Sequence, residues 1–492
     1  MDSTNVLVVG AGPAGLALAC GLREHDVPVR VIDQAAGPAT TSRANILHGR
    51  GVEVLNRLGA LGDLSDRAQH AISISYYVAD KRLATVSFGK IEGKQLSALL
   101  VSQAEIEAVL RQRLAELGCN VEWGRELTGL AQQPDGVTAT LQDGELHADY
   151  LAGCDGAHST VRKLSGIDFP GVPLIDQWLL ADVRVDWDLD RTGSSGWFHR
   201  DGLFFAMPMR SAENDTWRLM ADVRPTDGEQ PDVVDQLQQL LPERTGRTDA
   251  KIRDVAWTST FRIHRRLADR YREGRVLLVG DAAHIHSPFG GQGMNTGIGD
   301  AENLAWKLAL VAQGRADAAL LDTYQAERRP LAEDVVRNTT ANTKLMLADG
   351  PVARIVRDRL ITPLVNLKVV QRRVTWIASQ LWVTYRKGPL GSGKGPRPRP
   401  GDRVPDLDCR DDRGRPTRLH TELGGKWALL APTATGLETL APLGEHVVHL
   451  TPDQPRQESW LIRPDAHLAW RGTDQRALAR WLDEFRSNGR TT

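Results

Sequence analysis

A glycine-rich turn near the start of the chain, set between an apolar run and a helix-forming run, most constrains the fold. The run NVLVVGAGPAG carries Gly10, Gly12 and Gly15 in the G-x-G-x-x-G spacing, and a second β-like run, VPVRVI, ends at Asp33. A strand, a glycine turn, a helix and a second strand in this order form a β-α-β unit, which belongs to a parallel sheet covered by helices. The sequence therefore predicts an α/β fold with a Rossmann-like domain at its N-terminus.

The same residues suit a bound pyrophosphate. Gly10 permits a tight turn, Gly12 lets the backbone approach the phosphates, and Gly15 allows the helix to pack closely on the strand. The N-terminus of the helix presents unpaired N–H groups. Asp33 stands close to the offset of about 20 residues at which an acidic side chain accepts hydrogen bonds from a ribose. A chance glycine turn lacks these flanking elements, so we predict dinucleotide binding.

A second glycine-rich transition from strand to helix lies far downstream, in the segment RVLLVGDAAHIHSPFGGQGMN that begins at Arg275. Its apolar run ends at Gly280-Asp281, and a loop with Pro288 and several glycines leads into a helical run. An acid at the carboxyl end of a strand can accept from a sugar or ribitol hydroxyl. Two such transitions in one chain indicate a dinucleotide site built from distant pieces of sequence.

Three shorter motifs lie between these two segments, and each leaves two readings open. Arg43 follows the β-α-β unit and is either a phosphate or flavin partner or a solvated surface charge. Gln103 opens a periodic helix behind the candidate N-cap Ser102, so it contacts a ligand or simply belongs to a capped helix start. Asp155-Gly156 ends a strand-like run, and an isolated D-G pair is also a common turn dipeptide.

Residues 71–97 and 178–261 have a different hydrophobic pattern from the nucleotide-binding segments. They contain short alternating runs separated by turn signals, which predicts an antiparallel sheet. Large apolar side chains are frequent there. Each of them either packs in the core or lines a ligand pocket. The candidates for lining a substrate pocket are Trp197, Phe204, Phe205, Met207 and Trp217.

The C-terminal third divides into three segments. Residues 331–387 are helical in pattern and carry an apolar, arginine-bearing tract, which packs across the other domains or, alternatively, lies on a membrane surface. The Pro/Gly-rich run GPLGSGKGPRPRPG at 388–401 indicates a linker. Residues 402–492 form a further compact unit with strand-like runs and a final helix. Only Cys409 lies in this unit, which excludes dithiol chemistry within it.

Composition narrows the functional classes. A chain of 492 residues predicts two or three domains, and its net charge of −1 gives no reason to expect nucleic acid as a partner. The four cysteines form no C-x-x-C pair, so neither a metal site nor a disulfide framework is expected, and a cytoplasmic location follows. The apolar N-terminal run follows an acidic residue and is broken by Pro13, so neither a signal sequence nor stable membrane insertion is expected.

In order, these motifs resemble those of the class A flavoprotein aromatic hydroxylases, the single-component FAD monooxygenases related to para-hydroxybenzoate hydroxylase. The resemblance covers roughly residues 1–385 and rests on GAGPAG with Asp33, Ser42-Arg43 with Gln103, CDGAHSTVR, GDAAHIHSPFGGQGMN and YQAERRP. It implies FAD as cofactor, NADPH or NADH as reductant, and O2. Residues 402–492 look similar to the thioredoxin-like C-terminal domain of members that act on polycyclic polyketides or large phenols.

The resemblance also assigns site residues. It places Gly10, Gly12, Ala14, Gly15 and Asp33 at the ADP half of FAD, Arg43 and Gln103 at its pyrophosphate, Asp281 at the ribitol, and Gly293, Met294 and Asn295 along the isoalloxazine, with Leu127, Asp155, Gly156 and Pro288 as further cofactor contacts. Two of these are expected to take part in the reaction. Arg43 would help the flavin move between exposed and enclosed positions, and Pro288 would contribute its backbone in the loop over the flavin. General-base roles for His284 and His286 are the less favoured alternative.

The resulting expectation is a discontinuous FAD-binding domain (1–70, 98–177 and 262–330) with an inserted substrate-binding sheet domain (71–97 and 178–261). The implied activity is hydroxylation of a bulky, polycyclic phenol through a flavin C4a-hydroperoxide. Two alternatives stay open: a Baeyer–Villiger oxygenation, and a protein that holds flavin and an aromatic ligand with little turnover. An aromatic small molecule is the expected partner, and a homodimer is left open.

Overall fold

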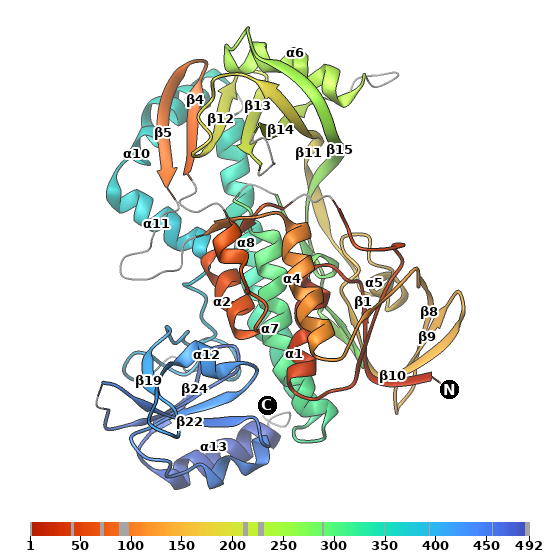
Figure 1. Cartoon of the computed structure of the whole chain (residues 1–492), viewed down its shortest axis with the longest axis vertical. Helices are drawn as coiled ribbons and strands as arrows, with labels where there is room; N and C mark the ends of the chain where they lie inside the picture. Colours follow the sequence, from red (N-terminus) through yellow and green to blue (C-terminus); the bar gives the residue numbers. More distant parts are fainter. Residues whose placement is uncertain are drawn as a thin grey trace.

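The computed structural model describes residues 2–40, 44–68, 73–87, 98–209, 215–224, 231–287, 290–348, 350–392, 394–454 and 456–487. Three parts are visible in Figure 1: a central α/β part, a sheet capped by helix α6 at the top, and a C-terminal α/β unit, in blue, at the lower left. Long helices α7 and α8 run through the centre and contact the parts on either side. The mixed α/β fold that the sequence predicts is confirmed.

A parallel sheet forms the central part, as the β-α-β pattern requires. Its parallel strands are, in order across the sheet, β17 (Val276–Leu278), β10 (Gly144–Gly153), β1 (Asp2–Val9), β2 (Val29–Asp33) and β7 (Val121–Trp123). Antiparallel β16 (Arg272–Glu273), β8 (Leu127–Gln132) and β9 (Val137–Leu141) complete it. Strand β1 is buried from Val6 onward, which explains its continuous apolar run.

Helices and a small ribbon cover this sheet. They are α1 (Pro13–Glu24), α2 (Gly49–Arg57), α3 (Leu64–Arg67), α4 (Gln103–Glu116), α5 (Thr160–Leu164), the 3-10 turn η1 (Gly280–Ala282) and α7 (Gly293–Ala312), with β3 (Ile46–Leu47) paired to β6 (Leu99–Leu100). Helix α1 packs against both α7 and α4. Gly21 of α1 lies so close to Ala305 of α7 that an added Cβ would stand 2.7 Å from the Ala305 Cβ. This close approach joins the first and second glycine-rich segments.

The second sheet is antiparallel apart from one pair. Its order is β18 (His284–Ile285), β15 (Lys251–Leu267), β11 (Gly171–Asp186), β14 (Thr216–Val223), β13 (Gly202–Pro208), β12 (Ser194–His199), β4 (Ser73–Val78) and β5 (Lys81–Ser87), with α6 (Val233–Thr245) on one face. Strands β12 and β4 pair in parallel, which the alternating pattern alone does not predict. The expected domain boundaries at 177/178 and 261/262 fall inside β11 and β15, because these long strands run on into the central part.

The helical segment covers an edge of this sheet. It comprises η2 (Ala318–Leu321), α8 (Asp322–Leu347), α9 (Pro351–Val356), the π-helical turn η3 (Arg357–Ile361), α10 (Thr362–Leu364) and α11 (Lys368–Ser379). Asn366 Nδ2 donates to Leu83 O at 2.9 Å, and Gln371 Nε2 donates to Thr85 O at 3.0 Å. These bonds cap the free edge of β5. Within the described residues, we find no helix with the length and hydropathy needed to cross a membrane.

A six-stranded sheet forms the C-terminal unit. Its order is β20 (Pro416–Arg418), β19 (Asp408–Arg410), β22 (Val447–Pro452), β21 (Trp427–Leu430), β23 (Ser459–Ile462) and β24 (Leu468–Gly472), flanked by α12 (Leu419–Leu423), η4 (Glu438–Leu443) and α13 (Gln475–Ser487). The Pro/Gly-rich run before it is fixed at its end rather than free, because Gly401 N donates to Leu468 O and Gly401 O accepts from Tyr385 N, both at 2.7 Å. The unit is therefore anchored against the helical segment.

One buried acid gives a pH-dependent stability. The Glu24 side chain, at the end of α1, is 5% exposed, and burial raises its pKa to about 7 although Arg113 lies 3.4 Å away. A carboxyl with a higher pKa in the folded state binds more protons than the unfolded chain between about pH 4.5 and 7, so stability falls as the pH rises through that range. At about 1.4 kcal/mol per pH unit, the full cost above pH 7 is about 3 kcal/mol.

We therefore expect Glu24→Gln to raise the thermal-unfolding midpoint at pH 8 and to leave it unchanged near pH 4. The matched control is Glu116→Gln, which removes the exposed second partner of Arg113 and should shift neither midpoint. Calorimetric scans of both variants at the two pH values measure this. A Glu24→Gln variant that is less stable than the wild type at pH 8 would contradict it.

Candidate functional site

The first glycine turn forms a concave backbone cradle. Its shape depends on Gly10 and Gly15, and Gly12 lies at its opening. Gly10 has a φ of +105°, and a Cβ there would lie 2.4 Å from Cys154 O; a Cβ on Gly15 would lie 2.0 Å from Gly10 O. A Cβ on Gly12 would meet no atom within 4 Å in the part of the chain that the structure describes. Gly12 is also the N-cap of α1 and supplies no side-chain cap. Open space before a helix N-terminus with unpaired N–H groups fits a pyrophosphate.

Asp33 lies beside this cradle. Its Oδ2 accepts from Ala11 N at 2.7 Å and its Oδ1 accepts from Ala35 N at 2.8 Å. The carboxylate is thus fixed at the end of β2, next to the glycine turn, with further lone pairs for a ribose hydroxyl. Leu127 is only 4% exposed and packs in the core of the central part, so a ligand contact there would have to come from its backbone.

Gln103 stands at the start of α4, beside Ala44. Its backbone N donates to Ala44 O at 2.9 Å, and its Nε2 donates to Glu107 Oε1 at 2.8 Å. Ser102 forms the predicted N-cap as part of a capping box with Glu105. Arg43 itself, like Pro288, lies outside the described residues, and the roles expected for both stay predictions.

The Asp155-Gly156 motif also stabilises the local fold, in addition to the cofactor contact that the family resemblance implies. The Asp155 carboxylate accepts from Ser159 Oγ at 2.5 Å and from Val161 N at 3.0 Å, which caps α5. Gly156 has a φ of +77°, so glycine suits the turn there. Arg162 Nη1 donates to Ala282 O at 2.9 Å and thereby holds this motif against η1.

The downstream glycine segment lies directly against the first one. Gly280 has a φ of +63°, and a Cβ there would stand 3.1 Å from Ala14 Cβ and 3.5 Å from Gly297 Cα. Asp281, the next residue, is exposed at the carboxyl end of the parallel sheet. Because Ala14 and Asp281 belong to segments predicted to hold the two halves of FAD, this contact joins both segments in one site.

Asn295 does not offer its side chain to a ligand. It is 1% exposed; its Nδ2 donates to Ile46 O and Gly291 O, both at 2.9 Å, and its Oδ1 accepts from His48 N at 2.8 Å. The amide therefore holds β3 and the loop before α7 against the N-terminal turn of α7. Any isoalloxazine contact here would come from backbone, as it would at Gly293, while Met294 packs half-buried on the core.

The general-base roles of the two histidines in this segment stay the less favoured prediction. His284 is fully buried, and its Nε2 lies 2.6 Å from Asp300 Oδ2, while Asp300 Oδ1 accepts from Arg328 Nε at 2.6 Å. Burial alone would raise the pKa of Asp300, but Arg328 and His284 outweigh it and lower that pKa. Burial also lowers the pKa of His286 to about 4, so it is neutral at pH 7.

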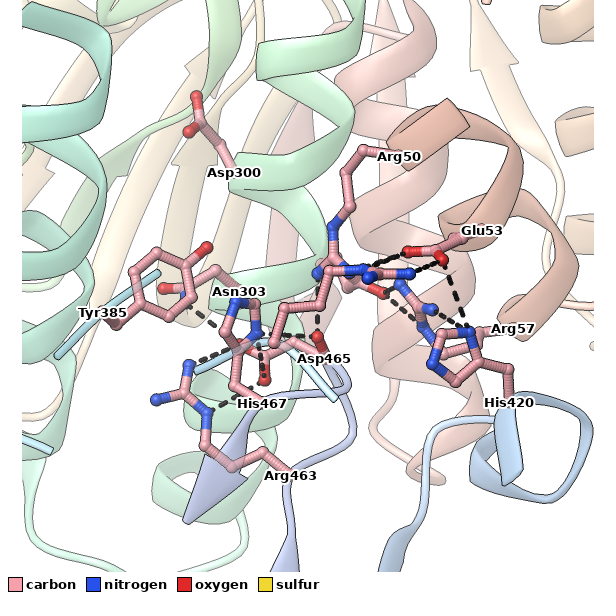
Figure 2. Close-up of polar contacts among 12 residues, drawn as sticks. Arg50, Glu53, Arg57, Asp300, Asn303, Tyr385, His420, Arg463, Asp465 and His467 are labelled. Atoms are coloured by element: carbon pink, nitrogen blue, oxygen red, sulfur yellow. Dashed lines mark hydrogen bonds and ion pairs between the residues drawn. The ribbon is translucent and has the colours of Figure 1, made fainter. Parts of the chain in front are cut away.

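Sequence reasoning missed a buried ion network that anchors the C-terminal unit to α7 and α8. Figure 2 shows three of its members, Asn303, Arg463 and Asp465. Arg463 donates to both carboxylate oxygens of Glu327, at 2.8 and 2.9 Å, and Lys307 Nζ donates to the same carboxylate at 2.8 Å. Asn303 Nδ2 donates to Glu327 at 2.8 Å and to Asp465 at 3.2 Å. The signal was in the sequence: Asp300, Glu302, Asn303 and Lys307 are polar positions on a helix whose other positions in this stretch are mostly apolar.

A second branch of the network joins α2 to the same unit. Glu302 of α7 accepts from Arg50 at 2.8 Å and from Arg57 Nε at 2.7 Å. Arg57 Nη1 lies 3.1 Å from His420 Nδ1 of α12, and Arg403 Nε donates to Glu53 at 2.9 Å. Figure 2 shows the α2 side chains turned toward the C-terminal unit. The buried ion pairs thus attach α2 and α7, the helices beside the glycine segments, to the C-terminal unit.

The five candidate pocket residues divide between the two faces of the second sheet. Side chains alternate along a strand, so neighbours such as Phe204 and Phe205 must point to opposite faces. Trp197, Phe204 and Trp217 pack with Leu237 and Leu241 of α6. This face lies away from the central part (Figure 1), so the packing favours a core role for these three.

Phe205 and Met207 lie on the other face, which looks toward the central part. Phe205 packs in a cluster that includes Met346 and Leu347 of α8. Met207 packs against Ile46 and Ala98, at the β3–β6 ribbon that Asn295 holds to α7. An apolar wall therefore stands opposite the start of α7.

Two family models match the chain. The one described as FAD binding domain matches residues 3–339, and the one described as aromatic-ring hydroxylase, C-terminal, matches residues 397–485. The chain belongs to this family of FAD-binding aromatic-ring hydroxylases. It is an FAD-dependent monooxygenase that uses O2 and a reduced nicotinamide. The glycine cradle and Asp33 fit that cofactor on their own geometry.

Similar proteins agree along nearly the whole chain. Rifampicin monooxygenase of Streptomyces venezuelae is 38% identical over 485 residues, which cover 96% of this chain and 97% of that protein. The structure of anhydrotetracycline hydroxylase from Streptomyces rimosus has a TM-score of 0.82 at 32% identity, covering 98% of this chain and 99% of its own. The ternary complex of aklavinone-11 hydroxylase with FAD and aklavinone has a TM-score of 0.81 at 27% identity, with 99% of each chain covered. These relatives favour hydroxylation over the two alternative activities.

Proposed function

We propose that this monooxygenase hydroxylates a bulky, polycyclic phenol bound between the inner face of the second sheet and the start of α7. The observation that carries the proposal is the apolar wall of Phe205 and Met207 opposite the β3–α7 junction. Relatives named for rifampicin and anhydrotetracycline support a large multi-ring substrate. An apolar, water-poor wall suits an aromatic ring and limits side reactions with water.

Each part of the chain has a stated task in this proposal. The N–H groups at the start of α1 bind the pyrophosphate, Asp33 accepts from the ribose, and Asp281 accepts from the ribitol. When bound, FAD supplies the redox chemistry, taking hydride from NADH or NADPH and activating O2. Asn295 holds β3 against α7 so that the sheet wall and the flavin site keep a fixed spacing. Arg43 and Pro288 stay in the proposal with the roles that the family resemblance gives them.

The test is turnover with purified holoenzyme. We expect a yellow protein that retains FAD and oxidises NADPH or NADH faster when a phenol from a panel of 1-naphthol, 1,8-dihydroxyanthraquinone, anhydrotetracycline and rifampicin is added. Mass spectrometry with ¹⁸O2 should find one labelled oxygen in the product. Binding of the panel without faster NAD(P)H oxidation would support a ligand-holding protein instead. Insertion of oxygen into a ring C–C bond would support the Baeyer–Villiger alternative.

Neighbouring phenylalanines offer a test of which sheet face meets the substrate. Phe205→Leu should raise KM for the panel phenol by about tenfold, since an apolar pocket contact contributes roughly 1–3 kcal/mol. The matched control, Phe204→Leu, changes the same side chain one residue away, on the α6 face. It should lower the unfolding midpoint and leave KM within twofold of the wild type. A reversed pair of results would place the substrate on the α6 side of the sheet.

The proposal also includes a cytoplasmic location, supported by four cysteines that are all buried free thiols. A homodimer remains part of it as well. Light scattering on the holoenzyme measures the mass in solution against the 54.1 kDa of one chain.

A further inference from the structure

The side chain of Asn45 is buried without a proper hydrogen-bond partner. It precedes β3, is 6% exposed, and directs its Nδ2 toward two thioether sulfurs, 3.0 Å from Met209 Sδ and 3.7 Å from Met207 Sδ. Its Oδ1 is buried and accepts no hydrogen bond in the part of the chain that the structure describes. The amide is thus polar at both ends in surroundings that satisfy neither end well.

Such an arrangement is costly unless something else binds there. Thioether sulfur is a weak acceptor, and a buried polar atom without a partner destabilises the folded state. Buried polar groups without partners are rare enough that each needs an explanation. Leucine would fill this place without that cost, beside Met207, which packs against Ile46 and Ala98. A polar residue here is therefore unfavourable for folding alone and is explained by a ligand that completes its hydrogen bonds.

The position of Asn45 points to the same ligand site. Next to it, Ile46 O accepts from Asn295, so the start of β3 is fixed to the N-terminal turn of α7. On its other side, Met207 belongs to the inner face of the second sheet. Asn45 therefore lies between the two walls that the proposed function assigns to the flavin and to the substrate.

The orientation of the amide decides which ligand group it can bind. An N–H directed at sulfur is a weak hydrogen bond, whereas a carbonyl oxygen in the same place would face sulfur lone pairs. The atom left without a partner is then the acceptor Oδ1. An acceptor recognises a hydroxyl and cannot recognise a ketone or a methyl ether.

We propose that Asn45 Oδ1 accepts a hydrogen bond from the phenolic hydroxyl of the substrate and selects phenols over their ethers. The inference rests on the proposed function. The hydroxyl proton stays on the phenol, because an amide is not a base, but the bond draws it toward Oδ1 and increases electron density in the ring. Asn45 would thus fix which ring carbon meets the flavin and make that ring more reactive.

The test uses holoenzyme, the panel phenol that best stimulates NAD(P)H oxidation, and the methyl ether of that phenol. Binding is measured from the change in the flavin spectrum. We expect the wild type to bind the phenol at least tenfold more tightly than the ether, and Asn45→Leu to lose that preference while retaining FAD. The matched control is Met209→Leu, which removes the sulfur near Nδ2 and should keep the preference.

A stability readout separates this role from a structural one. Asn45→Leu should melt, without substrate, at the wild-type temperature or above it, because it removes an unsatisfied amide. A clearly lower midpoint would overturn the inference by showing that the amide supports the fold. Equal binding of phenol and ether by a wild type that turns over the phenol would also overturn it and leave the proposed function standing. If no panel phenol stimulated the wild type, the proposed function itself would fail.

Discussion

Gly10→Ala is expected to prevent both stable folding and FAD binding, whereas Gly12→Ala should prevent only FAD binding. At Gly10, a methyl group would lie 2.4 Å from Cys154 O and 2.9 Å from Asp155 Cα, both backbone atoms, and the φ of +105° strains any L side chain. Neither β1 nor β10 can move away, because they are neighbouring strands in the buried parallel sheet. The combined clash and strain should cost several kcal/mol, about the full stability margin of many domains.

Gly12 differs because no atom of the described residues lies within 4 Å of an added Cβ, and its φ of −74° suits any residue. A need for glycine there can come only from a ligand that approaches the backbone. Gly12→Ala should therefore express and melt like wild-type apoprotein, yet lose FAD affinity by at least tenfold. Fluorescence titration with FAD and melting of the apoprotein, run on both variants, measure the difference. Undiminished FAD affinity in Gly12→Ala would contradict the placement of the pyrophosphate.

The glycine segments could be predicted from sequence because their constraint is local. Gly10, Gly12 and Gly15 act on backbone within a few residues of one another, and the strand and helix on either side confirm the spacing. The roles of Asn295 and Asp155 could not be predicted in the same way. Their side chains bind backbone groups, and the identity of those groups depends on how β3 and α5 pack.

Two further features show where sequence reasoning ends. Alternation along β13 does place Phe204 and Phe205 on opposite faces, but only the position of α6 decides which face is the core of the sheet. The ion network is still less accessible, since Arg50 donates to Asp465 O across 415 residues of sequence. Charged residues on a buried helix indicate that partners exist, and the fold alone tells which partners they are.

Glu327→Gln should release the C-terminal unit from α7 and α8. The Glu327 carboxylate is fully buried and accepts from Arg463 at 2.8 and 2.9 Å and from Lys307 at 2.8 Å. Glutamine keeps the shape but leaves two buried cations without this counterion, a change that costs about 3–5 kcal/mol. We expect a lower melting midpoint and faster proteolysis within residues 388–401. The control Asp334→Asn breaks the exposed pair with Arg337 and should cost at most about 1 kcal/mol.

The pH dependence of this variant identifies the mechanism. Burial lowers the pKa of Lys307 to about 8, and Glu327 opposes that shift. Without the carboxylate the folded-state pKa falls further below the ordinary 10.5, so the unfolded chain binds more protons over that interval and stability rises with pH. Glu327→Gln should therefore recover part of its stability loss relative to the wild type as the pH rises to about 8, above which the wild type gains stability at the same rate. Glu327→Gln with Lys307→Met should show no such recovery, because Arg463 does not deprotonate. Melting scans across that range measure both. A loss that stays constant with pH in Glu327→Gln would mean that burial of Lys307 is not the source of its cost.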